Sequence, residues 1–238
     1  MRRRAWFVPI VLAAAVSLAG AALAEPTDPI RTPSTVTGSL VAHVKPGSVV
    51  NVRARPFGRV LAEVSSRTEF GSSTALSVAR TLRGRWLAVR TPLLPNGSVG
   101  WVDARAGGLR FAHSSVELEV DLSRRELRVL VGGRVTQAWP VAVGRPGSET
   151  PTGHFAVTDK LPGSRYSPDY GCCILALSGH QTHLPPGWSG GSRLAIHGTP
   201  NPADIGRAVS AGCLHASSHA LLYLMRRVPL GASVLIHA

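Results

Sequence analysis

The sequence is poor in cysteine, and its few cysteines follow no familiar pattern. Three cysteines in 238 residues exclude a disulfide-rich scaffold, and an odd count leaves at least one thiol unpaired. Cysteine and histidine also show no spacing typical of a metal site, and the chain has no internal repeats or heptads. The hydrophobic share of 44% is too high for a disordered chain, so we expect one large or two small folded domains.

The N-terminus resembles a secretory signal. Arginines at 2–4 are followed by a largely apolar run over 5–18 and by the small-residue sequence Ala-Leu-Ala at 22–24. A transmembrane anchor is the alternative, but the apolar run is short, interrupted and not followed by a charged stop. We therefore expect residues 1–24 to be a cleavable signal peptide and the protein to be exported to the periplasm or cell wall. Residues 25–37, rich in Pro, Thr and Ser, are expected to form a flexible linker.

Lysine is nearly absent, because Lys45 and Lys160 are the only two, and arginine carries almost all of the formal net charge of +13. Nucleic acid is the usual partner of so basic a chain, but export excludes it. Arginine binds carboxylate and phosphate groups bidentately, which fits the anionic polymers of a bacterial cell wall. The alternative is that the arginines only form a solvated surface.

Residues 38–110 show short β segments separated by turn residues. The expected strands are 48–52, 60–64, 76–82, 86–90 and 99–102. Two stretches, Val50 to Pro56 and Gly100-Trp101-Val102, resemble the bacterial Src-homology-3-like domains that often accompany wall enzymes. We therefore expect a small β-barrel here, acting either as a wall-targeting module or as a spacer.

Residues 115–237 show a second β-rich pattern with one helix. The expected strands are 116–120, 126–131, 135–143, 155–158 and 233–237. Segment 161–191 is dense in Gly, Pro and Ser, and we expect a long binding loop or lid. One helix is expected, capped by Ser217 or Ser218 and ended by Pro229. The predicted fold is mainly β, with a small N-terminal β-barrel followed by a β-sandwich-like domain with one main helix.

The segment 161–191 also contains Cys172, Cys173 and Tyr166, which either shape a groove or simply pack. A disulfide between adjacent cysteines closes a strained eight-membered ring. We therefore expect two buried thiols rather than a vicinal disulfide.

Candidate chemistry centres on Cys213 and His197. A thiol with a pKa near ~8.5 is mostly protonated at neutral pH, so a nucleophilic cysteine needs a neighbouring base such as an imidazole. His197 ends an apolar run, and the turn at Gly198 can orient its ring. Cys213 follows Gly212 directly before the expected helix cap, so the N–H groups of these two residues are candidates for an oxyanion hole. The alternative is that Cys213 is a small buried apolar residue.

The order of these motifs resembles the L,D-transpeptidase catalytic family. Ile196-His197-Gly198-Thr199, followed by Ser210-Ala211-Gly212-Cys213-Leu214, is similar to the family's active-site signature, in which a histidine precedes an S-x-G-C segment at about this separation. Segment 150–155 resembles the family's strand entry, and 229–236 resembles its C-terminal strand. The resemblance covers residues 115–237 and implies an L,D-transpeptidase catalytic domain.

The resemblance implies two-step acyl transfer on peptidoglycan stem peptides, with crosslinks between stems as the product. The Cys213 thiolate would attack the third stem residue and release D-alanine, with His197 as general base and acid. The carbonyl of Gly198 would hold the imidazole. Ser210, His215 and Tyr166 are candidate substrate contacts. No metal or organic cofactor is needed for this chemistry, and carbapenem-type inhibitors would acylate the same thiol.

Three positions depart from the family pattern. Ala211 stands where histidine or another polar residue is common, and Ser192 where some relatives have aspartate. More important, His215 stands where an arginine usually follows the cysteine. Histidine lacks a fixed charge and a bidentate fork, so lower activity, an altered substrate or a decayed enzyme are all open.

Two other functions compete with this interpretation. A non-catalytic wall-binding protein with a degenerate transpeptidase domain is the first. A sortase is the second, but it needs an arginine on a strand after the cysteine, whereas Arg226 and Arg227 end the expected helix. Papain-like wall peptidases are disfavoured because they place the cysteine before the histidine.

Overall fold

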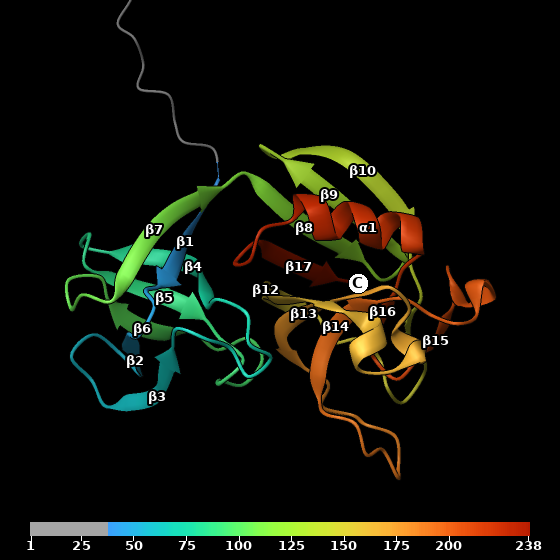
Figure 1. The fold of residues 1–238 in the computed structure, drawn as a ribbon, viewed down its shortest axis with the longest axis horizontal. Coiled ribbons are helices and arrows are strands. Elements are labelled where there is room, and N and C mark those ends of the chain that lie inside the picture. Colours follow the sequence, from blue (N-terminus) through green and yellow to red (C-terminus); the bar gives the residue numbers. More distant parts are fainter. Residues whose placement is uncertain (1–37) are drawn as a thin grey trace, which may run out of the picture. The chain divides into compact units, whose positions relative to one another are not determined.

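The computed structural model describes residues 38–238, shown as a ribbon in Figure 1. The predicted signal peptide (1–24) and linker (25–37) lie outside the described residues. None of the helices in the described part of the chain has the length and apolar character needed to cross a membrane. All described residues fall in one unit by their contacts, so the domain boundaries at 110 and 115 stay a prediction.

The first sheet contains seven antiparallel strands in the order β3-β2-β6-β5-β4-β1-β7. Their bounds are β1 Ser39–Val44, β2 Val49–Arg53, β3 Val60–Ser65, β4 Ala75–Leu82, β5 Trp86–Arg90, β6 Gly100–Asp103 and β7 Leu109–Ser114. Alternating side chains such as Ala42, Val52 and Val102 form a buried core. The expected β-rich first part is confirmed, although the sequence pattern missed β1 and β7.

The second sheet contains eight strands in the order β10-β9-β8-β17-β12-β13-β14-β16 (Figure 1). Their bounds are β8 Val116–Asp121, β9 Glu126–Val131, β10 Arg134–Pro140, β12 Gly153–Pro162, β13 Cys173–His180, β14 Arg193–His197, β16 Leu214–His215 and β17 Ser233–His237. A small parallel pair joins β11 Val143–Gly144 to β15 Ala208–Ser210. The buried core of the second sheet contains Leu118, Phe155 and Leu175. The helix α1, Ser218–Arg227, adds Leu221 and Leu224 to this core. A mainly β fold with one main helix is therefore confirmed.

The expectation of an uninterrupted loop over 161–191 was wrong, because β13 lies in the middle of this segment. The strand runs between β12 and β14, and seven of its eight residues are buried. A strand covered on both faces has a continuous apolar run instead of an alternating one. The surrounding Gly, Pro and Ser residues therefore concealed it.

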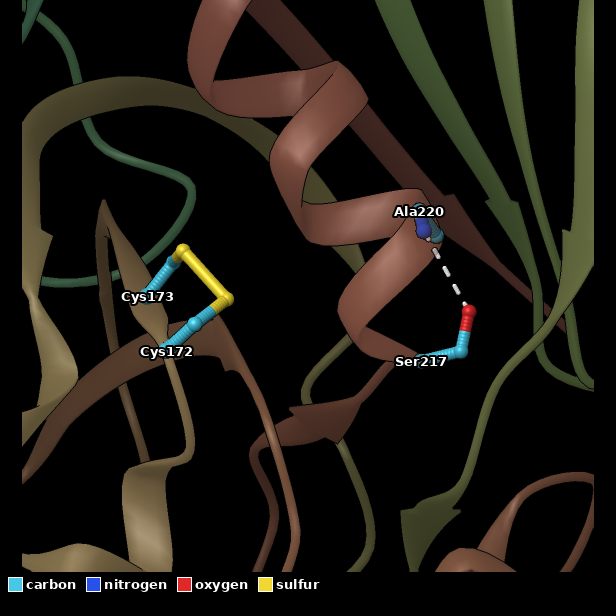
Figure 2. The surroundings of a disulfide bond; sticks show 4 residues. All are labelled: Cys172, Cys173, Ser217 and Ala220. Atoms are coloured by element: carbon cyan, nitrogen blue, oxygen red, sulfur yellow. Dashed lines mark hydrogen bonds between the residues drawn. A yellow bond between two sulfur atoms is a disulfide. The ribbon is translucent and has the colours of Figure 1, made fainter.

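The expectation of two buried thiols at Cys172 and Cys173 was also wrong. The two residues form a disulfide, with Cα atoms 3.7 Å apart, at the start of β13 (Figure 2). Cys172 is exposed in the turn before the strand, and Cys173 is its first buried residue. Because Cys172 lies outside the strand ladder, its side chain is not committed to the face opposite Cys173. Cys213 is the remaining cysteine and is free.

The helix α1 has a cap at each end. The side chain of Ser217 accepts a hydrogen bond from the Ala220 N–H at 3.3 Å, as expected for an N-cap residue (Figure 2). At the other end, Lys160 Nζ of β12 donates to the carbonyls of Met225 and Val228 at 2.9 and 3.0 Å. The charge of this lysine therefore lies at the negative end of the helix dipole.

Candidate active site

Two parallel strands bring the predicted histidine and cysteine to one place. In the pairing of β14 with β16, Ile196 lies opposite Leu214 and His197 opposite His215. Cys213 immediately precedes β16, and alternate residues of a strand share a face. Accordingly, Cys213, His197 and His215 all line one cavity of about 590 Å³.

His197 is held in one orientation. Its side chain is buried, and its Nδ1 lies 2.7 Å from the carbonyl oxygen of Gly198. A carbonyl can only accept, so Nδ1 carries the proton and Nε2 keeps the lone pair that a base requires. The N–H of Gly198 donates to the carbonyl of Tyr170 at 2.9 Å, and the Tyr170 ring meets the imidazole edge to face at 4.8 Å between centroids.

The residue after this histidine has no room for a side chain. A Cβ at Gly198 would lie 2.8 Å from the Cα of Gly171 and 2.8 Å from the Tyr170 carbonyl oxygen. Glycine therefore allows the turn before β13 to approach the end of β14 closely. This approach fixes the carbonyl that accepts the hydrogen bond from His197.

Cys213 is half-buried, and its sulfur contacts the backbone of β14. The thiol donates to the carbonyl of Arg193 at 3.8 Å, and the Ala195 N–H donates to the sulfur. Among residues 38–238, no hydrogen bond joins Cys213 directly to His197. Catalytic hydrogen bonds are often long or poorly aligned before substrate binds, so this geometry is compatible with a base that engages later.

Burial shifts both groups toward their neutral forms. It raises the pKa of the Cys213 thiol to about 11, against the opposing effect of the Ala195 N–H. Burial, and then the neighbouring charge of His215, lower the pKa of His197 to about 4, against the opposing hydrogen bond to Gly198. At neutral pH the resting site therefore holds a thiol and a neutral imidazole.

The loop around Cys213 is tied by Ser210. Its hydroxyl donates to the Cys213 carbonyl at 2.6 Å and accepts from the Gly212 N–H at 3.0 Å. These two hydrogen bonds give the buried hydroxyl a positioning role, and because Ser210 also lines the cavity, the predicted substrate contact stays a prediction. The Gly212 N–H is engaged as well, so an oxyanion hole that uses it requires this hydrogen bond to be exchanged.

The expectation that Cys213 directly precedes the helix cap was wrong. The strand β16, Leu214–His215, lies between Cys213 and the N-cap residue Ser217. Pairing with β14 takes precedence over an immediate helix start, because the strand completes the edge of the sheet. The dipole of α1 falls off within its first turn, so it is not the feature that would ionise the Cys213 thiol.

Residues 115–236 match the YkuD family, described as the L,D-transpeptidase catalytic domain. The chain belongs to this family. Bacillus licheniformis YkuD is 34% identical over 119 residues, which cover 50% of this chain and 64% of that protein. Bacillus subtilis YkuD is 33% identical over 122 residues, covering 50% and 65%.

Both Bacillus proteins carry the name "Putative L,D-transpeptidase YkuD", and the matched part spans just under two thirds of their length. Among solved structures, an L,D-transpeptidase from Mycobacterium smegmatis is 19% identical with a TM-score of 0.43, covering 68% of this chain and 82% of that one. The LdtMt1 transpeptidase, solved in complex with imipenem, is 20% identical with a TM-score of 0.44, covering 70% and 92%.

His215 occupies the position where the L,D-transpeptidase pattern predicts an arginine. Its ring lies 4.7 Å from that of His197, and its Nδ1 lies 3.8 Å from a carboxylate oxygen of Asp204. This Nδ1 is buried without a hydrogen bond. Burial lowers the pKa of His215, against the attraction of Asp204, so this position lacks the fixed positive charge of an arginine.

Tyr166, the third predicted substrate contact, lines the same cavity from the segment between β12 and β13. Its side chain is 41% exposed. The position is compatible with a ligand contact, and that role stays a prediction. Among residues 38–238, no group of three or more His, Cys, Asp or Glu side chains is placed to hold a metal ion.

Gln181 was missed by the sequence reasoning, although it holds the site together. Its buried amide donates to the carbonyls of Ser148, Glu149 and Ala211 at 3.1, 2.9 and 3.1 Å. A Cβ at Gly212 would collide with the same amide. The partners of this amide are about 30 residues away in the chain, so no local pattern could have identified it.

Arg193 and Asp204 were missed as well. Arg193 begins β14, and a charge at the start of an apolar strand was the available signal.

Ser192, noted as a departure, hydrogen-bonds through its hydroxyl to His180 Nδ1 at 2.8 Å. It therefore supports the connection between β13 and β14 in a way that does not require the aspartate found in some relatives.

Proposed function

We propose that this protein is a peptidoglycan L,D-transpeptidase that crosslinks stem peptides through a thioester on Cys213, with His197 as general base and acid. One observation carries the proposal. The parallel pairing of β14 with β16 places the free cysteine and an imidazole of defined tautomer in the same cavity. Family membership supports the reaction class.

The first half of the reaction forms the acyl-enzyme. Nε2 of His197 takes the proton from Cys213 Sγ as the sulfur attacks the carbonyl carbon of the third stem residue. The tetrahedral intermediate then collapses, the C–N bond to D-alanine breaks, and the imidazolium protonates the leaving amine. In the second half, an amine of another stem attacks the thioester, the thiolate leaves, and a new amide bond forms.

The timing of proton transfer follows from the shifted pKa values. A thiol with a pKa of about 11 does not pass its proton to an imidazole with a pKa of about 4 in the resting site. Proton transfer therefore accompanies attack on the bound substrate.

The proposal extends to location, partners and inhibitors. The signal-like residues 1–24 support export to the periplasm or cell wall, where the stem peptides are found. Arginine-rich surfaces support contact with other anionic wall polymers. Carbapenem-type compounds acylate thiolates of this reaction class, so Cys213 is their expected target.

The first experiment is mass spectrometry of a disaccharide tetrapeptide incubated with the protein. We expect the native protein to release D-alanine and form a crosslinked dimer. A Cys213→Ala variant removes the nucleophile, and loss of the nucleophile costs at least about a thousandfold in rate. Equal product from both proteins would assign the reaction to another residue or to a contaminant.

A second candidate function is non-catalytic wall binding, and His215 favours it because it replaces a fixed positive charge. Wall binding without catalysis predicts that the native protein causes no reaction. It also predicts that native protein and the Cys213→Ala variant sediment equally with purified wall.

A sortase is disfavoured, since Arg226 and Arg227 lie in the last turn of α1 and not on a strand.

A further inference from the structure

The loop between β3 and β4 of the first sheet reaches the Cys213 cavity. Phe70 of this loop lines the cavity and packs against a small apolar cluster formed by Leu161, Ile174 and Ala195. Cys213 packs against the same cluster. Phe70, which belongs to a loop of the first sheet, and Cys213 therefore pack against the same apolar cluster.

Arg193 connects this loop to the nucleophile. Its guanidinium forms an ion pair with Glu69 and lies 5.5 Å from the centroid of the Phe70 ring. It also donates to the Leu177 carbonyl at 2.7 Å, which anchors it in the second sheet. The backbone carbonyl of Arg193 accepts a hydrogen bond from the Cys213 thiol. One residue thus touches the loop with its side chain and the nucleophile with its backbone.

Further contacts fix the position of the loop. The Thr68 hydroxyl donates to the carboxylate of the buried Asp159 in β12. A different loop, between β5 and β6, is tied to β13, because Asn96 and His180 exchange two hydrogen bonds of 2.6 and 2.8 Å through the Asn96 side chain. The contacts of Thr68 and Glu69 hold the β3–β4 loop, and with it Phe70, at the cavity.

The side chains that line the cavity divide into apolar and polar ones. Phe70 meets Tyr166 edge to face, with centroids 6.1 Å apart, beside Leu161 and Ile174. Arg145 and His215 also line the cavity and supply polar groups. An acyl donor with both a hydrocarbon chain and charged groups fits this division, because each part finds a matching surface.

We propose that Phe70 is a specificity-determining residue, against which the hydrocarbon part of the acyl group on Cys213 packs, and that Glu69 positions it through Arg193. The role of Phe70 in the choice of acyl donor rests on the proposed function. The position of Phe70 in the same cavity as the Cys213 thiol does not depend on that function. The role and the position are therefore tested by separate experiments.

The placement is tested by thiol labelling, which requires no transpeptidase activity. Iodoacetamide and a bulky aryl maleimide are compared on the full chain, and modification of Cys213 is followed by mass spectrometry. Removing a wall beside a half-buried thiol opens it to the bulky reagent, so Phe70→Ala is expected to raise the maleimide-to-iodoacetamide rate ratio about threefold. Phe111→Ala, which removes an exposed ring of β7, is the matched control. An unchanged or lower ratio in Phe70→Ala overturns the proposal.

The role in specificity is tested by kinetics with a tetrapeptide donor. Phe70→Ala is expected to raise KM about tenfold with little change in kcat, and Phe70→Tyr to restore it. Glu69→Gln is expected to give part of the same KM change and Glu69→Asp to rescue it, since only the aspartate keeps the charge that binds Arg193. If the native protein shows no turnover, the proposed function fails while the labelling ratio still decides the placement. If kcat falls with KM unchanged, Phe70 does not determine specificity.

Discussion

The two walls of the Cys213 cavity are built differently. One wall consists of β14, β16 and the Gly212 loop, where His197 is 7% exposed and nearly every polar group has a backbone partner. The other wall consists of loop residues such as Tyr166 and Trp188, whose side chains are 41% and 45% exposed. Groups that need fixed geometry lie on the strand wall, and groups that can select a ligand lie on the loop wall. Each prediction below tests this division.

The largest expected effect comes from the buried His197. Its pKa is about 4 in the folded protein against an ordinary 6.5, so the unfolded chain binds a proton first as pH falls. The stability contributed by the neutral form is complete above pH 6.5 and is lost between pH 6.5 and about 4. The loss in the free energy of unfolding is expected to reach about 3 kcal/mol.

Urea denaturation at pH 7 and at pH 4.5 measures this loss. His197→Gln should show a much smaller drop than the native protein, while His113→Gln, at an exposed position of β7, should keep it. An equal drop in the free energy of unfolding for native protein and His197→Gln would mean that another group carries the pH dependence. It would also mean that water reaches the His197 ring despite its burial.

The next effect compares the same substitution on both walls. Gly198→Ala places a Cβ 2.8 Å from two backbone atoms, whereas a Cβ at Gly191 would meet nothing within 4 Å. The shifted backbone would move the carbonyl that orients His197, so acylation of Cys213 by a carbapenem should slow about thirtyfold. Gly191→Ala should change the rate by less than about twofold. Stopped-flow measurement of acylation distinguishes them, and equal rates would remove the difference between the walls.

A smaller effect is expected from Gln181, which ties the Gly212 loop of the strand wall to the segment of Ser148 and Glu149. Gln181→Ala leaves three carbonyls without their donor, and we expect the free energy of unfolding to fall by about 2 kcal/mol. Gln137→Ala, on β10, is the control and should stay within about 0.5 kcal/mol of the native value. Thermal and urea denaturation measure both. A normal stability for Gln181→Ala would show that water replaces the amide without loss.

The same division explains what the sequence could predict. The helix with its Ser217 cap and the strands β5 and β17 follow local patterns, and their predicted positions agree with the structure. The order of His197 and Cys213 was enough to expect them in one site, and parallel pairing brings them to the same cavity.

What could not be predicted depends on distant contacts. The strand β13 lacks alternation because both of its faces are covered, so its sequence does not show the pattern of a half-buried strand. Gln181 and Phe70 act on residues that lie 30 or more positions away, and neither belongs to a recognisable motif. The disulfide of Cys172 and Cys173 depended on a turn that the sequence did not define.

The position of β17 has a consequence for how the protein is made. This strand pairs in parallel with β8 and antiparallel with β12, so it fills the middle of the second sheet. A nascent chain that has not yet released residues 233–237 leaves the facing edges of β8 and β12 open, and open edges invite pairing with other chains. Closing so distant a strand is also slow. The second sheet is therefore complete only after residues 233–237 have been made.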